Sequence, residues 1–206
     1  FCDSDSHVCR DFAEDHAVLM DRDEKLVWLS WHPAYNEDDP LGNGDSNIRS
    51  DELMTIAPAI RLDFQRLEGI GDGTDFIAKN AGLALNGTIP SAGGIVAADI
   101  PLEITLIDLN GDDMVDEIDL SSDFTPRVNL SSDVILNFVI VEWYPEIRNE
   151  GPRPPHTVKE WTATAAFSKE AGNTTSIQHT FSAEHISSAE IEIDADDAQR
   201  FGIIAF

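Results

Sequence analysis

The sequence predicts an α+β fold in which a mixed α/β part, residues 1–90, is followed by an all-β sandwich, residues 91–206. In the first part, stretches with helical spacing of apolar residues alternate with short apolar runs. After Ser91 the pattern changes to short runs of period-two alternation, separated by turn residues. A chain of 206 residues, 42% of them hydrophobic, can bury the core of one large domain or two small ones.

The first part predicts helices and strands in turn. Apolar residues with helical spacing indicate a helix over residues 10–25. A second helix candidate covers residues 74–85, before the turn residues Asn86 and Gly87. A further helix over residues 45–54 begins at a candidate cap, Asp45 or Ser46. The strands expected between these helices cover residues 25–31 and 57–64.

The second part predicts two packed sheets, because its short alternating runs follow one another at short intervals. Alternation places one side chain in the core and the next in solvent, which is typical of antiparallel strands. The expected strands cover residues 104–108, 115–120, 134–142, 161–167, 176–181, 189–193 and 201–206.

Charge is the strongest compositional signal. Thirty-nine acidic residues face thirteen basic ones, which gives a formal net charge of −26. Such a surface repels nucleic acid and anionic membranes, so neither is expected as a partner. No apolar run approaches the roughly 20 residues of a membrane-spanning helix, so membrane insertion is not expected either. Asp-rich, Lys-poor surfaces suit salty water, and a marine or halophilic source stands beside an ordinary acidic secreted protein as an interpretation.

Several features favour an exported protein. Two closely spaced cysteines, Cys2 and Cys9, are typical of a local disulfide or a redox pair. Three N-x-S/T sequons, at Asn86, Asn129 and Asn173, are candidate glycosylation sites. We therefore expect an extracytoplasmic location, secreted or at the cell surface. Both ends fall inside expected strands, so we also expect a longer chain, with the N-terminal strand of the first domain missing here.

The order of elements in the first part resembles the thioredoxin fold. Cys9 and Arg10 stand at the start of a helix, as the second cysteine of a Cys-x-x-Cys motif does, and Pro58 stands where that fold carries its cis-proline. With the sandwich, nearly the whole chain resembles exported thioredoxin-like proteins, outer-membrane lipoproteins among them, that end in an immunoglobulin-like domain. The resemblance implies a thioredoxin-like domain over residues 1–90. Ser6 occupies the place of the nucleophilic cysteine, so the redox site is degenerate.

The two cysteines leave three interpretations open. A helix N-terminus lowers the pKa of a thiol, so Cys9 could act as a catalytic nucleophile with Cys2 as its resolving partner. Nearby acids, among them Asp3 and Asp11, oppose thiolate formation. A structural disulfide between Cys2 and Cys9 is the favoured interpretation, and free or metal-bound thiols are the third.

Residues 108–119 have the oxygen spacing of a calcium loop. Side chains of Asp108, Asn110, Asp112, Asp116 and Asp119 fall at positions 1, 3, 5, 9 and 12, and the carbonyl of Met114 falls at position 7. Asp113 stands where the sharp turn prefers glycine, which counts against the site. The favoured alternative is a β-hairpin with a two-residue Asn110-Gly111 turn. A hairpin tip with this many carboxylates could still bind calcium weakly.

Three functions follow from these features. The first hypothesis is a non-enzymatic secreted or surface protein that binds a protein partner, or assembles with itself, through open strand edges. The second is a thiol-disulfide oxidoreductase that uses Cys9 and Cys2. The third is a calcium-stabilised adhesion module.

Overall fold

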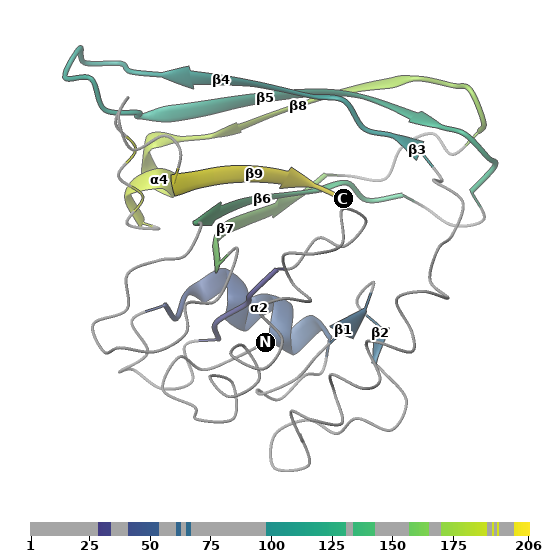
Figure 1. Cartoon of the computed structure of the whole chain (residues 1–206), viewed down its shortest axis with the longest axis horizontal. Coiled ribbons are helices and arrows are strands. Elements are labelled where there is room, and N and C mark those ends of the chain that lie inside the picture. The colour runs from purple at the N-terminus through teal and green to yellow at the C-terminus, as the bar shows by residue number, and fades with distance from the viewer. Residues whose placement is uncertain are drawn as a thin grey trace. The chain divides into compact units, whose positions relative to one another are not determined.

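The computed structural model describes two compact units. The described residues are 29–33, 41–53, 61–62, 65–66, 98–130, 134–142, 157–164, 170–188, 191, 193 and 200–206 (Figure 1). One unit comprises Phe1–Gly94 with Glu142–Val158, and the other comprises Ile95–Val141 with Lys159–Phe206. The expected boundary between residues 90 and 91 lies outside the described residues.

In the first unit, helix α2 (Gly44–Glu52) is held at its start by Asn43. The Oδ1 atom of Asn43 accepts a hydrogen bond from the backbone N–H of Ser46 at 2.8 Å, which satisfies one of the free amides of the first turn. The helix over residues 45–54 was therefore predicted correctly, but its cap is Asn43 and not Asp45 or Ser46. The Nδ2 atom of Asn43 also donates to the carbonyl of Val158, at 2.8 Å.

The remaining expectations for the first part are only partly covered. Strands β1 (Arg61–Leu62) and β2 (Gln65–Arg66) form a short antiparallel pair in and beyond the strand expected over residues 57–64. The helices expected over residues 10–25 and 74–85 lie outside the described residues. Within the part of the chain that is described, a thioredoxin-like domain is not evident.

The second unit contains a sheet centred on the long strand β5 (Glu117–Pro126). β4 (Leu102–Ile107) pairs with one side of β5 and β8 (Thr175–Phe181) with the other, both antiparallel. The two-residue strand β3 (Ala98–Asp99) pairs antiparallel with the last residues of β5. A second sheet has the order β7-β6-β9, formed by β7 (Thr157–Ala163), β6 (Asn137–Glu142) and β9 (Phe201–Ala205). The described fold is thus mostly β, with two antiparallel sheets and little helix.

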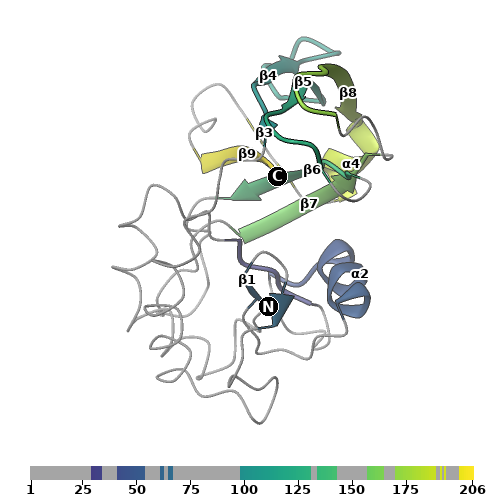
Figure 2. The same ribbon diagram turned by 90° about the vertical axis from the view of Figure 1, so that its right-hand side faces the viewer.

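The core lies between these two sheets, which Figures 1 and 2 show from two sides. β5 alternates strictly, so that Ile118, Leu120 and Phe124 are buried while Asp119 and Asp123 face solvent. β6 is buried at five consecutive positions: the apolar run of residues 138–141 and then Glu142. The buried cluster contains residues from both sheets, from helix α4 (Ala183–Ser188) and from the segment after it: Ile118, Leu120, Phe124, Leu136, Phe138, Ile140, Ile177, Phe181, Ile186, Ile191 and Ile193.

One expected strand, over residues 189–193, was wrong where it can be compared. Ile191 and Ile193 lie outside the strands, directly after helix α4, which the sequence analysis did not predict. Both isoleucines are buried, at 5% and 3% exposure, so their period-two spacing corresponds to burial of both side chains. The carbonyl of Ile193 accepts a hydrogen bond from the N–H of Val115 at 2.9 Å. Among the described residues, no helix is long and apolar enough to cross a membrane.

Candidate functional site

The hairpin formed by β4, β5 and the loop between them is the candidate site. The last paired residues are Ile107 and Glu117, so residues 108–116 form the connection. The expected hairpin is present, but the expected two-residue Asn110-Gly111 turn is wrong. The reason is visible in the loop, where polar side chains accept most of the backbone N–H groups and hold a wider turn.

Asp108 organises the first half of this loop. Its Oδ1 atom accepts hydrogen bonds from the N–H groups of Asn110 and Gly111, at 3.1 and 2.6 Å. Its Oδ2 atom accepts from the N–H of Asp113, at 3.0 Å. These bonds, that from Gly111 foremost, hold the pKa of the Asp108 carboxyl below its ordinary value. The carboxylate is thus charged and fixed in place by the backbone.

The next two polar positions repeat the same contact. Oδ1 of Asn110 accepts from the N–H of Asp112 at 2.9 Å, and Oδ1 of Asp112 accepts from the N–H of Met114 at 3.0 Å. Gly111 and Asp113 take positive φ angles, 82° and 67°. Asp113 therefore adopts the conformation for which glycine was expected, because Asp tolerates the left-handed region better than most residues.

Four of the five predicted side-chain ligands share the loop, and one does not. Oδ2 of Asp116 accepts from the N–H of Leu109 at 2.7 Å, which ties the two sides of the loop together. Asp119 lies instead within β5, where its Oδ1 accepts a hydrogen bond from Thr180 on β8. Position 12 of the predicted calcium loop is therefore engaged in the sheet. Within the part of the chain described, no group of three or more His, Cys, Asp or Glu side chains has the geometry of a metal site.

β4 is the exposed side of the hairpin. Cross-strand pairs share one face of a sheet, so Ile104 and Leu106 lie on the same face as their buried partners on β5, Leu120 and Ile118. Yet Ile104 and Leu106 are 46% and 47% exposed, whereas their partners are 2% and 1% exposed. The core-facing side of this sheet is therefore only partly covered at β4, where two apolar side chains remain exposed to solvent.

The opposite face of the same sheet is acidic. Three of its acids have a neutral hydroxyl on the neighbouring strand as their partner: Ser121 Oγ donates to Glu103 at 3.3 Å, Thr180 to Asp119, and Ser176 Oγ to Asp123 at 2.6 Å. Hydroxyl groups satisfy hydrogen-bonding capacity without neutralising charge. This face therefore carries net negative charge.

On the other side of β5, an aromatic cluster covers the core face. The ring of His179 stacks on Phe138, with centroids 6.1 Å apart, and meets Phe181 edge to face at 4.8 Å. Burial, and to a smaller extent the charge of His185, lowers the pKa of His179. No sequence motif marked His179 as a candidate site residue. Its inward position in the alternating run of β8 was the available signal.

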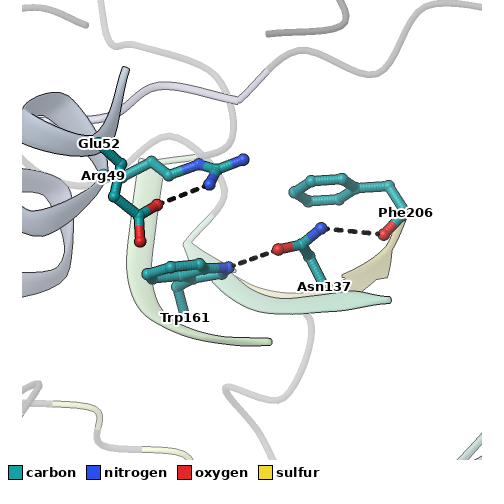
Figure 3. A network of polar contacts seen from close by, with 5 residues as sticks. All are labelled: Arg49, Glu52, Asn137, Trp161 and Phe206. Carbon is teal, nitrogen blue, oxygen red and sulfur yellow. Dashed lines mark hydrogen bonds and ion pairs between the residues drawn. The ribbon is translucent and has the colours of Figure 1, made fainter. Parts of the chain in front are cut away.

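Figure 3 shows two further sets of polar contacts, one between strands β6 and β7 and the chain after β9, and one within helix α2. Trp161 Nε1 donates to Asn137 Oδ1 at 3.0 Å, and Asn137 Nδ2 donates to the carbonyl of Phe206 at 3.4 Å. The backbones of Asn137 and Phe206 also exchange two hydrogen bonds, at 2.8 and 3.0 Å, so the chain after β9 is fixed to β6. On α2, Arg49 donates to Glu52 at 2.8 Å.

The other predicted site residues fall into two groups. Cys2, Cys9, Pro58 and the sequon at Asn86 lie outside the described residues. Asn129 and Asn173 are exposed, as a glycosylation site requires. The Oδ1 atom of Asn129 accepts from the N–H of Ala171 at 2.9 Å, which brings the loops that carry these two sequons together.

Comparisons with known proteins identify no family. No protein-family model matches the sequence, and no curated protein is significantly similar to it. The structure is similar to part of β-glucosidase 3B from Thermotoga neapolitana in complex with glucose, with 8% identity and a TM-score of 0.28 over 45% of this chain and 12% of that one. It is similar to part of a β-glucosidase from Kluyveromyces marxianus, with 12% identity and a TM-score of 0.25 over 52% and 14% of the two chains. This chain thus spans about an eighth of the length of these enzymes.

Proposed function

We propose that the protein is an extracytoplasmic binding protein without enzymatic activity, secreted or held at the cell surface. Its β unit presents the β4–β5 hairpin to a protein partner. The observation that carries this proposal is the exposure of Ile104 and Leu106 on a strand whose described pairing is to β5 alone. Monomeric proteins generally cover or charge such an edge, so an apolar one indicates a contact surface.

In this proposal the first unit is a thioredoxin-like domain with a degenerate redox site, and the second is an immunoglobulin-like sandwich. Ser6 in the place of the nucleophilic cysteine supports the first half, because serine cannot form the mixed disulfide that starts thiol exchange. Two antiparallel sheets around a single core support the second half. Cys2 and Cys9 then form a structural disulfide.

A turnover assay and a binding screen test this function together. We expect no reduction of a protein disulfide substrate above background at any redox poise, by the wild-type protein or by Cys9→Ser. We also expect the full chain to select peptides from a displayed library of random ten-residue segments. Turnover that Cys9→Ser abolishes would establish the oxidoreductase alternative and refute the proposed function.

A calcium-stabilised adhesion module is the second candidate. It rests on the spacing of oxygen side chains in the 108–116 loop, although the described carboxylates are not gathered into a metal site. Oxygen side chains at Asp108, Asn110 and Asp112 are already fixed by the loop's own N–H groups, and Asp113 already adopts the left-handed turn. Asp, Asn and backbone carbonyl oxygens are the ligands that calcium prefers. Binding would stabilise the folded state, because the unfolded chain lacks the arranged ligands.

Two loop variants of equal charge distinguish specific calcium binding from general screening of the loop's negative charge by a divalent cation. Asp112→Ala and Asp113→Gly each remove one negative charge, but only Asp112 occupies a predicted ligand position. We expect calcium to raise the melting temperature of the wild type and of Asp113→Gly, and not that of Asp112→Ala. Magnesium at equal ionic strength serves as the control. A calcium response that all three proteins share, or that none shows, removes this candidate.

A further inference from the structure

The free edge of β4 is the strongest candidate for a specific docking site. β4 pairs with β5 from Leu102↔Ser122 to Ile107↔Glu117, and the described residues place no strand on its other side. In an antiparallel strand, alternate residues direct their N–H and C=O groups away from the paired neighbour. An edge strand therefore offers a row of backbone groups that another extended chain can bind.

The side chains of β4 define two different faces for such a chain. Ile104 and Leu106 lie on the core-facing side and stay about half exposed, so an added strand with apolar residues on that side would extend the core. Glu103 and Thr105 lie on the opposite face, and both are exposed. A matching segment must therefore alternate apolar residues with residues that suit an acidic surface.

Charge determines what those alternate residues are. Thr105 lies directly across from Asp119, so Glu103 and Asp119 are neighbours on the outer face, and the hydrogen-bond partners given above for both are neutral hydroxyls. Lys or Arg on the added strand would face these carboxylates across the strand, a pairing that stabilises sheets. The same charges act against a second copy of this chain, because each copy carries a formal charge of −26.

Native proteins use Lys, Pro or a bulge to prevent unwanted pairing at exposed edges. β4 contains neither Lys nor Pro, since its residues are Leu-Glu-Ile-Thr-Leu-Ile. Pro101 directly precedes β4, and Glu103 is the one charged residue within it. The negative charge of Glu103 disfavours a second acidic copy and favours a basic segment. We therefore propose that β4 binds an extended segment of a partner protein, in which apolar residues alternate with Lys or Arg, by adding it as a strand. This inference rests on the proposed binding function and names the site and chemistry of the partner.

The test uses the full chain and a fluorescent eight-residue peptide that alternates Val and Lys. A peptide of the same composition with its four Val residues contiguous controls for charge alone, and a Val/Glu peptide controls for backbone pairing alone. We expect anisotropy to report binding of the alternating Val/Lys peptide, with at least tenfold weaker binding of both controls. Protection of the amides of residues 102–107 from hydrogen exchange should accompany binding.

Variants on β4 locate the site. Ile104→Thr with Leu106→Thr places β-branched side chains, which favour strands, at both positions but removes the apolar surface, and should weaken binding about tenfold. Glu103→Lys should weaken binding of the Val/Lys peptide and strengthen binding of the Val/Glu peptide. The matched controls are Ile135→Thr, an apolar side chain that is 55% exposed, and Glu184→Lys, an exposed acid on α4. Neither control should change affinity, and urea midpoints should verify that all variants fold.

The outcomes are distinct. Binding that the β4 variants leave unchanged, equal binding of the contiguous peptide, or a dimer that the Ile104→Thr and Leu106→Thr changes dissociate would overturn the proposal. If library peptides bind the β4–β5 hairpin but leave the amides of residues 102–107 unprotected, the inference fails while the proposed binding function survives. If Cys9-dependent turnover is found and the Val/Lys peptide still binds β4, the non-enzymatic function fails while the inference survives.

Discussion

β4 and β8 both pair antiparallel with β5, but their inward side chains have different surroundings. We call β8 the covered flank of β5, and β4 together with β3 its open flank. On β8, Ile177 and Phe181 are 8% and 1% exposed, whereas on β4, Ile104 and Leu106 are 46% and 47% exposed. Helix α4 begins two residues after β8 and places Ile186 in the same buried cluster. β4 instead continues into the loop of residues 108–116, whose Leu109 is 62% exposed.

The difference shows that the apolar content of a strand does not determine its burial. β4 reads Leu-Glu-Ile-Thr-Leu-Ile and is the more apolar of the two, while β8 reads Thr-Ser-Ile-Gln-His-Thr-Phe. Burial is decided by the elements that pack over a strand, such as helix α4 at the end of β8, and not by the strand's own composition. An apolar strand that is left uncovered is therefore informative about binding.

The largest expected effect comes from truncating one inward side chain on each flank of β5, Phe181 on β8 and Leu106 on β4. Phe181→Ala removes a side chain that is 1% exposed and should lower the free energy of unfolding by about 3–5 kcal/mol. Leu106→Ala removes a half-exposed side chain and should cost about 1 kcal/mol or less, because burial of a whole Leu contributes only about 1.5–3 kcal/mol. Urea unfolding measures both values. Equal costs would show that β4 is covered in solution and would contradict its role as an open edge.

Glycine substitutions test whether the turns beside the two flanks also differ. Gly111 adjoins β4 and Gly172 precedes β8, with φ angles of 82° and 75°, and a Cβ at either would meet no atom within 4 Å. Gly111→Ala and Gly172→Ala should therefore each cost about 1 kcal/mol, from backbone conformation alone. Gly44→Ala, at the start of α2 and without a positive φ, is the control and should not destabilise. A negligible cost at Gly111 would show that the loop unfolds independently of the sheet.

The strands of the second unit were largely predictable, because alternation along β5 and β8 and the apolar run of β6 follow directly from burial. The presence of the hairpin was predictable, but the length and type of the turn between its strands were not. Asn110-Gly111 is a strong two-residue turn signal, yet the carboxylate of Asp108 accepts three backbone N–H groups and makes a longer loop more favourable. Competition between local turn types depends on three-dimensional geometry that spacing alone does not contain.

The site residues were predictable to a smaller extent. The oxygen spacing from Asp108 to Asp116 corresponds to a formed loop, but Asp119 is drawn into the sheet by Thr180, a residue 61 positions later in the sequence. The exposed edge of β4 was not localised, because exposure depends on the absence of a covering layer. The cap at Asn43 was missed since Asp45 and Ser46 are equally good caps by residue type.

A smaller effect concerns His179 in the covered flank. Its pKa is lowered below the ordinary value of 6.5, mainly by burial, so the folded state binds a proton less readily than the unfolded chain. The contribution of neutral His179 to the stability of the fold is therefore complete above about pH 6.5, and it is lost as the pH falls from there through the folded pKa. Urea midpoints between pH 5 and 8 should fall on acidification in the wild type and less in His179→Phe, which keeps an aromatic ring against Phe138 and Phe181. An identical pH dependence in both proteins would assign the effect to other groups.

The smallest expected effect is at the far end of the open flank, where Arg127 forms a bidentate ion pair with Asp99 of β3. This contact, chiefly the hydrogen bond, lowers the pKa of Asp99, so any stabilisation is present above the ordinary value of 3.8 and is lost as the pH falls through the folded pKa. Both side chains are about half exposed, and water and salt screen such pairs. Arg127→Gln should therefore leave the melting temperature unchanged at neutral pH, in low and in high salt. A drop of several degrees that high salt removes would mean that charge holds β3 against β5, and that the open flank, like the covered one, depends on a specific contact to stay paired.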